Sequence, residues 1–212
     1  MKLITLGDSI TRGTFTQMGE EGVFSSVAKP NYSERLQELL GADELLCMGM
    51  NGVSISRTSP VFPENALSIL CEQCKDADVF VIAGGTNDSG NSVELGTEKD
   101  REDISFYGGL SVLFEKVREL NPKAKIFAVL PIRRQGEWEK PNKIGRFLSE
   151  YRVAILRRAI EYGITVIDGQ LVPINPDDEQ DREKYMIDGL HPNLEGHCLF
   201  AEVLYKEIKK YV

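Results

Sequence analysis

Three short polar segments, far apart in the chain, carry the residue types of a serine acyl-transfer site. They are Gly7-Asp8-Ser9, Gly85-Thr86-Asn87-Asp88 and Asp188-Gly189-Leu190-His191. Together they supply a serine hydroxyl, an amide side chain, and an aspartate three residues before a histidine. A serine hydroxyl needs a neighbouring base to attack a carbonyl at neutral pH, and that base needs a group that fixes its tautomer. The combination predicts an esterase.

Each residue has a defined role in this hypothesis. Ser9 is the predicted nucleophile, and His191 is the base that takes its proton and later protonates the leaving alcohol. Asp188 is expected to accept a hydrogen bond from the other ring nitrogen of His191 and to stabilise the imidazolium. The oxyanion of the tetrahedral intermediate needs donors, for which the candidates are the backbone N–H groups of Ser9 and Gly52 and the side chain of Asn87.

The elements that must position these residues follow from a repeated alternation of strand-like and helix-like sequence. Apolar runs of strand length occupy residues 3–6, 45–48, 79–83, 126–130 and 164–167. Helices are predicted between Asn31 and Gly41, over 106–120, from Ile144 to an end at Gly163, and from about Asn193 onwards. This alternation predicts an α/β protein with three layers, in which a mostly parallel five-stranded sheet is covered by helices on both faces.

Such a sheet brings the polar segments together at one edge. Ligands of open α/β sheets bind beyond the carboxyl ends of the strands. Ser9 follows the first predicted strand, Gly52 the second and Asn87 the third. Asp188 and His191 lie between the last strand and the final helix. We therefore expect all five residues at the same edge of the sheet.

The order of these residues gives the chain a resemblance to a known family. It resembles the GDSL, or SGNH, hydrolases, whose second name lists the serine, glycine, asparagine and histidine of four sequence blocks. The blocks here contain Ser9, Gly52, Asn87 and His191 in that order, across essentially the whole chain. The resemblance implies a flavodoxin-like SGNH hydrolase fold and the hydrolysis of carboxylic esters or thioesters without a cofactor or metal.

Two positions depart from the family pattern. Ile10 stands where the family name has leucine, which is a conservative exchange. Cys47 stands where the second block usually opens with asparagine, so the hydrogen bonding of that loop is not predicted. The prediction of the Gly52 N–H as an oxyanion donor is unaffected.

Four further residues are candidates for binding substrate. For Asp8 and Asp88, bracing of a loop is favoured over contact with a substrate or a catalytic role. Arg133 is a candidate for binding an anionic group, and Trp138 for stacking on a sugar or lining an acyl chain. The competing interpretations are a loop-bracing ion pair and a solvent-facing aromatic. Substrate choice is expected to depend on three loops, over residues 89–103, 132–141 and 172–186.

Length and composition set further limits. The chain has 212 residues and 42% hydrophobic residues, which predicts one domain, residues 1–212, of a soluble protein. Its net charge of −8 argues against nucleic acid or an anionic membrane as a partner. The chain lacks an apolar run of transmembrane length and a leader before Gly7, and it has four cysteines, so we expect a cytoplasmic enzyme with reduced thiols. The oligomeric state, monomer or homodimer, stays open.

Two other motifs favour structural interpretations. Cys71 and Cys74 form an isolated Cys-x-x-Cys pair at the end of a predicted helix, whereas a redox pair begins a helix after a strand. A zinc site would need further ligands. His197 has no carboxylate at the spacing that Asp188 has from His191, and is predicted to be structural.

The sequence favours a small-acyl or carbohydrate O-acetyl esterase, because no segment has the broad amphipathic lid of an enzyme that acts at lipid interfaces. A thioesterase or lysophospholipase of the same mechanism is the alternative. A metal-dependent phosphoesterase using Asp8, Asn87, Asp88 and His191 is disfavoured, since the chain has only two histidines. A non-catalytic binding domain should lack a triad residue, and a flavodoxin-type electron carrier should bind flavin.

Overall fold

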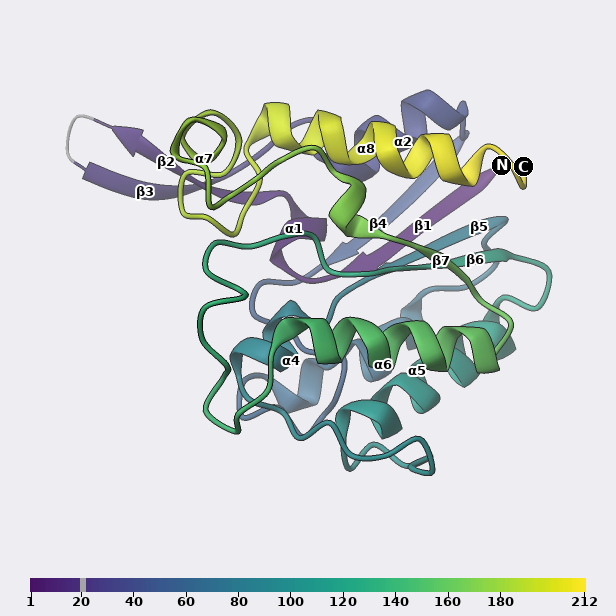
Figure 1. Ribbon diagram of the computed structural model, residues 1–212. Helices are drawn as coiled ribbons and strands as arrows, with labels where there is room; N and C mark the ends of the chain where they lie inside the picture. The colour runs from purple at the N-terminus through teal and green to yellow at the C-terminus, as the bar shows by residue number, and fades with distance from the viewer. Residues whose placement is uncertain (20–21) are drawn as a thin grey trace.

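The structure, a computed structural model that describes residues 1–19 and 22–212, is built on a five-stranded parallel sheet (Figure 1). Its strands are β1 (Lys2–Gly7), β4 (Glu44–Gly49), β5 (Val79–Ala83), β6 (Lys125–Val129) and β7 (Thr165–Ile167). They pair in the order β4-β1-β5-β6-β7, and each pair is parallel. Numbered within this sheet the order is 2-1-3-4-5, which is flavodoxin-like. The predicted fold class and all five strands are confirmed.

Helices cover both faces of the sheet (Figure 1). On one face lie α2 (Tyr32–Leu40) and α8 (Leu194–Ile208). On the other lie α3 (Leu67–Leu70), α5 (Phe106–Leu120) and α6 (Leu148–Glu161). In the part of the chain that the structure describes, no helix is long and apolar enough to cross a membrane.

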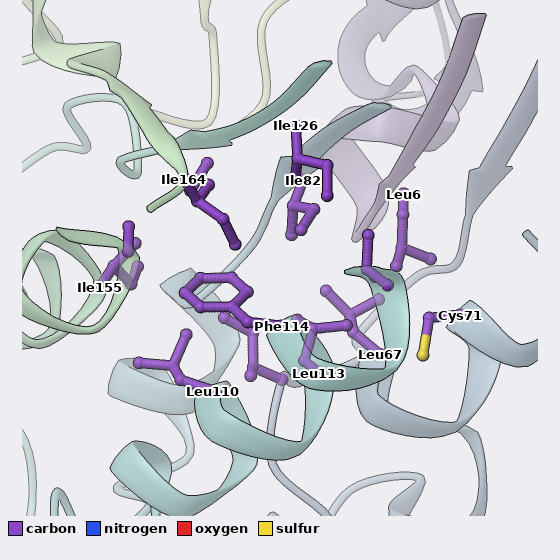
Figure 2. Packing of buried hydrophobic residues seen from close by; sticks show 14 of the residues in the cluster. Leu6, Leu67, Cys71, Ile82, Leu110, Leu113, Phe114, Ile126, Ile155 and Ile164 are labelled. Atoms are coloured by element: carbon purple, nitrogen blue, oxygen red, sulfur yellow. The ribbon is translucent and has the colours of Figure 1, made fainter. Parts of the chain in front are cut away.

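The hydrophobic core has two parts, one on each face of the sheet, because strand side chains alternate between the faces. Successive strand residues point to opposite faces, so Leu3 and Val79 pack with α2 and α8 whereas Ile4 and Phe80 pack with α5 and α6. Figure 2 shows the hydrophobic cluster on the α5 and α6 face, in which Phe114 and its neighbours on α5 pack against the sheet. This two-sided burial explains why the strands are continuous apolar runs in the sequence.

The helix predictions agree with the structure except at one boundary. Asn31 caps α2 through a capping box, and Asn193 caps α8, as expected. The helix predicted from Ile144 to Gly163 begins only at Leu148, so the prediction of its first turn is wrong. The Asn142 side chain accepts hydrogen bonds from the N–H groups of Ile144 and Arg146 and holds this segment in a turn instead.

A two-stranded antiparallel hairpin, not expected from the sequence, projects away from the sheet (Figure 1). It consists of β2 (Thr14–Gly19) and β3 (Gly22–Val27). The remaining short elements are α1 (Ser9–Arg12), η1 (Pro63–Asn65), η2 (Cys71–Gln73), α4 (Thr86–Gly90), η3 (Gly169–Leu171) and α7 (Glu179–Tyr185). Of these, α1 and α4 begin at the carboxyl ends of β1 and β5, where the polar segments lie.

Candidate active site

Ser9 is held at the carboxyl end of β1 by a tight turn into α1. The Asp8 side chain caps this helix by accepting a hydrogen bond from the Ile10 N–H at 3.0 Å. A Cβ at Gly7 would lie 2.3 Å from the Ala83 carbonyl oxygen, so only glycine allows the two strands to end this close together. The turn leaves Ser9 at the carboxyl edge of the sheet, where it is 8% exposed. Its hydroxyl points to His191 in the segment 188–191.

The structure brings Ser9, His191 and Asp188 into one hydrogen-bonded chain. The Ser9 hydroxyl lies 2.9 Å from Nε2 of His191, and Nδ1 of His191 lies 2.8 Å from Oδ2 of Asp188. The other carboxylate oxygen of Asp188 accepts hydrogen bonds from the backbone N–H groups of Leu190 at 2.9 Å and His191 at 2.7 Å. These two bonds hold residues 188–191 in a turn, which places the carboxylate beside the imidazole.

The environment keeps Asp188 ionised at neutral pH. Burial by itself would raise the pKa of this carboxyl. The hydrogen bonds from the His191 ring and N–H, from the Thr16 hydroxyl and from the Leu190 N–H outweigh it and hold the pKa of Asp188 well below its usual range. A charged carboxylate at this position can orient the imidazole and stabilise its protonated form. Thr16 was not identified from the sequence.

Gly52 and Asn87 lie in the two neighbouring loops of the same edge. Gly52 has φ +73°, a left-handed conformation that favours glycine, and it follows β4. The Asn87 side chain donates to the Val53 carbonyl oxygen at 2.8 Å, which ties it to the Gly52 loop. An amide NH₂ group has two donors, and among the described residues no acceptor takes the second. This second N–H is available to an oxyanion.

Asp88 braces the loop that follows Gly52. It is completely buried, and it accepts hydrogen bonds from the backbone N–H groups of Ile55, at 2.9 Å and 3.1 Å to its two oxygens, and Ser56, at 3.1 Å. Burial raises the pKa of Asp88 to about 7. Asp103 holds the same segment by accepting hydrogen bonds from the Ser56 hydroxyl and the Arg57 N–H. These hydrogen bonds support the loop-bracing interpretation of Asp88, and its complete burial argues against contact with a substrate.

A family model described as GDSL-like lipase/acylhydrolase matches residues 5–199. The chain belongs to the GDSL-like lipase/acylhydrolase family. The matched segment contains all four blocks, from Ser9 to His191. A comparison with curated proteins found no match.

Solved structures share the fold over the whole chain. A protein from Lactobacillus plantarum is 23% identical with a TM-score of 0.83, covering 100% of this chain and 97% of that one. The aryl esterase of M. smegmatis is 19% identical with a TM-score of 0.70, covering 100% and 99%. Est24, a carbohydrate acetylesterase from Sinorhizobium meliloti, is 16% identical with a TM-score of 0.71, also covering 100% and 99%.

Two of the candidate substrate-binding residues of this GDSL-like hydrolase lie on one exposed loop. Arg133 is exposed, and the Trp138 side chain is 55% exposed. The guanidinium carbon of Arg152 lies 6.0 Å from the Trp138 ring centroid. The loop is anchored by a buried ion pair, 2.8 Å long, between Arg152 and Glu137. Contact of Arg133 or Trp138 with substrate stays a prediction.

Asp8 lines a small cavity between the ends of β1, β5 and β6. The cavity has a volume of about 20 Å³ and is otherwise bordered mainly by apolar residues, among them Ile10, Pro131 and Phe200. This volume holds about one water molecule. Asp8 is 4% exposed, and burial raises its pKa to about 6. Its capping bond to Ile10 supports the bracing interpretation, and contact of Asp8 with a substrate stays a prediction.

The other chemistry-bearing residues singled out in the sequence, His197, Cys71 and Cys74, are buried. His197 is completely buried, its Nδ1 accepts from the Tyr32 N–H at 3.3 Å, and burial lowers its pKa to about 4. Cys71 and Cys74 are also completely buried, and burial raises their pKa values to about 12 and about 11. Thiols that stay protonated are unreactive, which supports the structural interpretation of Cys71 and Cys74. The burial of His197 and its hydrogen bond to Tyr32 support the same interpretation for that residue. Within residues 1–19 and 22–212, no group of three or more His, Cys, Asp or Glu side chains is arranged to hold a metal ion.

Proposed function

We propose that this protein is a serine esterase that removes small acyl groups from soluble alcohols, with O-acetylated carbohydrates as the favoured substrate class. The observation that carries the proposal is the continuous hydrogen-bonded chain from Ser9 through His191 to Asp188, at 2.9 Å and 2.8 Å. A nucleophile, a base and an orienting carboxylate within hydrogen-bond reach are the requirement for nucleophilic catalysis by serine.

The geometry supports a two-step reaction. Ser9 attacks the acyl carbonyl carbon while Nε2 of His191 takes the hydroxyl proton, which produces a tetrahedral oxyanion. When this intermediate collapses, the bond to the alcohol breaks and His191 returns the proton to the leaving oxygen. Water then attacks the acyl-enzyme with the same assistance, which releases the carboxylic acid and restores the Ser9 hydroxyl. Asp188 stays ionised throughout and stabilises the imidazolium of both steps.

The oxyanion is assigned to the space between three donors. These are the backbone N–H groups of Ser9 and Gly52 and the second amide N–H of Asn87. Their positions on adjacent loops of one sheet edge support the assignment, and the bond from Asn87 to Val53 fixes two of the three loops relative to each other. Each such donor contributes about 10²–10³ to turnover in a serine hydrolase.

The preference for a small acyl group is supported by the sequence, in which no segment has the broad amphipathic lid of an enzyme that acts at lipid interfaces. One structural neighbour is a carbohydrate acetylesterase and another an aryl esterase. A thioesterase or lysophospholipase of the same mechanism differs in substrate only, so substrate profiles separate these alternatives.

The test is hydrolysis of 4-nitrophenyl acetate, butyrate and octanoate and of an acetylated xylo-oligosaccharide, with EDTA present, by wild type, Ser9→Ala and the exposed-site control Ser25→Ala. We expect rates that fall with acyl length, a collapse in Ser9→Ala and no change in Ser25→Ala. Faster turnover of acyl-coenzyme A or of a lysophospholipid would move the substrate class to the alternatives. Equal rates in wild type and Ser9→Ala, or no hydrolysis of any of these esters, would contradict the proposal.

A further inference from the structure

The hairpin touches both halves of the site through one strand. Thr14 and Thr16 are two residues apart on β2 and therefore point to the same face. The Thr14 hydroxyl donates to Oδ1 of Asn51 at 2.7 Å, next to the Gly52 donor. The Thr16 hydroxyl donates to Oδ2 of Asp188 at 2.6 Å, across 172 residues of sequence. A strand outside the central sheet thus contacts both the oxyanion loop and the triad carboxylate.

The bond from Thr16 completes the hydrogen bonding of the triad carboxylate. Among the described residues, Asp188 accepts four hydrogen bonds, of which three come from Leu190 and His191 within its own turn. Oδ1 takes both backbone N–H groups, whereas Oδ2 takes the His191 ring and the Thr16 hydroxyl. The fourth bond is therefore the one that comes from a different part of the fold.

Oδ2 is the oxygen on which the orientation of His191 depends. The terminal torsion of an aspartate side chain is broad, so the donors around it decide which way each oxygen points. The Asp188 side chain is 25% exposed and the His191 side chain 19% exposed, and water can compete for an oxygen that has no second protein donor. The short bond from Thr16 is charge-assisted, which makes it stronger than a bond between neutral groups.

We propose that Thr16 is a positioning residue for the catalytic triad, and that through it strand β2 forms a part of the active site. The inference rests on the proposed function, because a positioned triad matters only if Ser9 is the nucleophile. Thr16 holds Oδ2 of Asp188 toward Nδ1 of His191, and so holds Nε2 toward Ser9. The hydroxyl itself does not touch the reacting atoms.

The kinetic test compares Thr16→Val with Thr16→Ser and with the control Ser25→Val, using 4-nitrophenyl acetate. Ser25 pairs with Thr16 across the hairpin and its side chain is exposed, so Ser25→Val makes a similar change at a neighbouring site on the same ribbon. We expect kcat of Thr16→Val to fall about 10- to 100-fold with little change in KM, because a small misplacement of catalytic groups costs rate rather than binding. Thr16→Ser keeps the donor and should retain most of the activity, and Ser25→Val all of it.

A double-mutant cycle separates positioning of Asp188 from support of the hairpin. In an Asp188→Ala background the Thr16→Val change should lower kcat less than about twofold, because the group through which it acts is gone. An equal loss in both backgrounds, or full activity of Thr16→Val, overturns the inference. Thermal unfolding of each variant tests folding, and Thr16→Ala, which also lacks the hydroxyl, replaces Thr16→Val should that chain fail to fold.

The proton NMR signal of the Nδ1–H group of His191 provides a readout without turnover. The low-field resonance of a histidine hydrogen-bonded to a carboxylate should be present in wild type and Thr16→Ser, absent in His191→Asn, and shifted upfield or lost in Thr16→Val. An unchanged resonance in Thr16→Val contradicts the inference. Because Ser9→Ala leaves this hydrogen bond in place, activity that survives Ser9→Ala would refute the proposed function alone, and the resonance would still decide the position of Thr16.

Discussion

At the scale of single residues, the polar groups of the site differ in how many of their hydrogen bonds are made to other described residues. Asp188 is surrounded by donors, and Asp88 accepts from two backbone N–H groups. Asn87 differs from them, because one of its two amide hydrogens is bonded to Val53 and no described acceptor takes the other. This second N–H of Asn87 is a candidate donor to the oxyanion of the proposed reaction.

The role of Asn87 in turnover follows from this geometry. We expect Asn87→Ala to lower kcat about 10²–10³-fold with a smaller effect on KM, because an oxyanion exists only in the transition state and the intermediate. The measurement is steady-state kinetics with 4-nitrophenyl acetate, with the melting temperature as a check on the bond to Val53. A loss confined to KM would assign Asn87 to substrate binding instead.

Residue identity was predictable from the sequence where the function requires a particular chemical group. Ser9, Asp188 and His191 are identifiable because their types, order and strand-end positions agree, and the structure brings them together. Thr16 carries no such signal, since threonine is common in short strands and its partner is 172 residues away. Asp88 was assigned two roles because sequence position cannot distinguish a carboxylate that faces solvent from one that faces backbone N–H groups.

At the scale of elements, burial decided what could be predicted. The central strands β1, β5 and β6 are largely buried on both faces, and all five sheet strands are visible in the sequence as apolar runs. The hairpin is much more exposed to solvent: Met18 and Val23 are each 63% exposed, and Phe24 is 50% exposed. Its strands mix polar, small and apolar residues and resemble a loop in sequence. A run of β-branched and aromatic residues on both sides of a Gly-Glu-Glu-Gly segment was the available signal.

The loop that carries Arg133 and Trp138 depends on an interaction between elements. Arg152, on α6, donates to the carbonyl oxygens of Pro131 and Ile132 and to both carboxylate oxygens of Glu137. The two side chains are only 4% and 1% exposed. Removing one partner of a buried pair leaves an uncompensated charge.

We therefore expect Glu137→Ala to lower the free energy of unfolding by about 3–5 kcal/mol. Equilibrium urea denaturation followed by circular dichroism measures the change. Exposed Glu139→Ala, two residues along the same loop, is the matched control and should change it by less than about 0.5 kcal/mol. A similar small loss for Glu137→Ala would mean that solvent reaches Arg152 and that the loop is not anchored by this pair.

At the scale of the whole molecule, the sheet concentrates carboxylates at the edge where the reaction is expected. Asp8 and Asp88 are both buried behind this edge, 4% and 0% exposed, and the charge of Asp8 adds to the effect of burial on Asp88. The chain as a whole carries a net charge of −8, so no surplus of positive charge offsets them. Burying two carboxylates near each other is unfavourable, but their hydrogen bonds hold the α1 turn and the Gly52 loop in place.

This arrangement predicts a dependence of stability on pH. Burial raises the pKa of Asp88 from 3.8 to about 7, so the folded protein binds this proton more tightly than the unfolded chain does. The resulting contribution to stability is complete below about pH 4 and is lost as the pH rises through 7. Burial lowers the pKa of His197 from 6.5 to about 4, which acts in the opposite direction, since that contribution is present above pH 6.5 and lost at lower pH.

A comparison of wild type with Asp88→Asn removes the titration of Asp88 together with its coupling to Asp8, whereas the contribution of His197 is common to both proteins. Asparagine keeps an acceptor for the N–H groups of Ile55 and Ser56 but does not titrate. We expect the unfolding free energy of wild type, relative to Asp88→Asn, to fall by about 1 kcal/mol between pH 6 and pH 8. Urea denaturation of both proteins across this range measures the difference. A constant difference would show that Asp88 is already ionised at pH 6, and that the three hydrogen bonds from the backbone to its oxygens outweigh the loss of hydration.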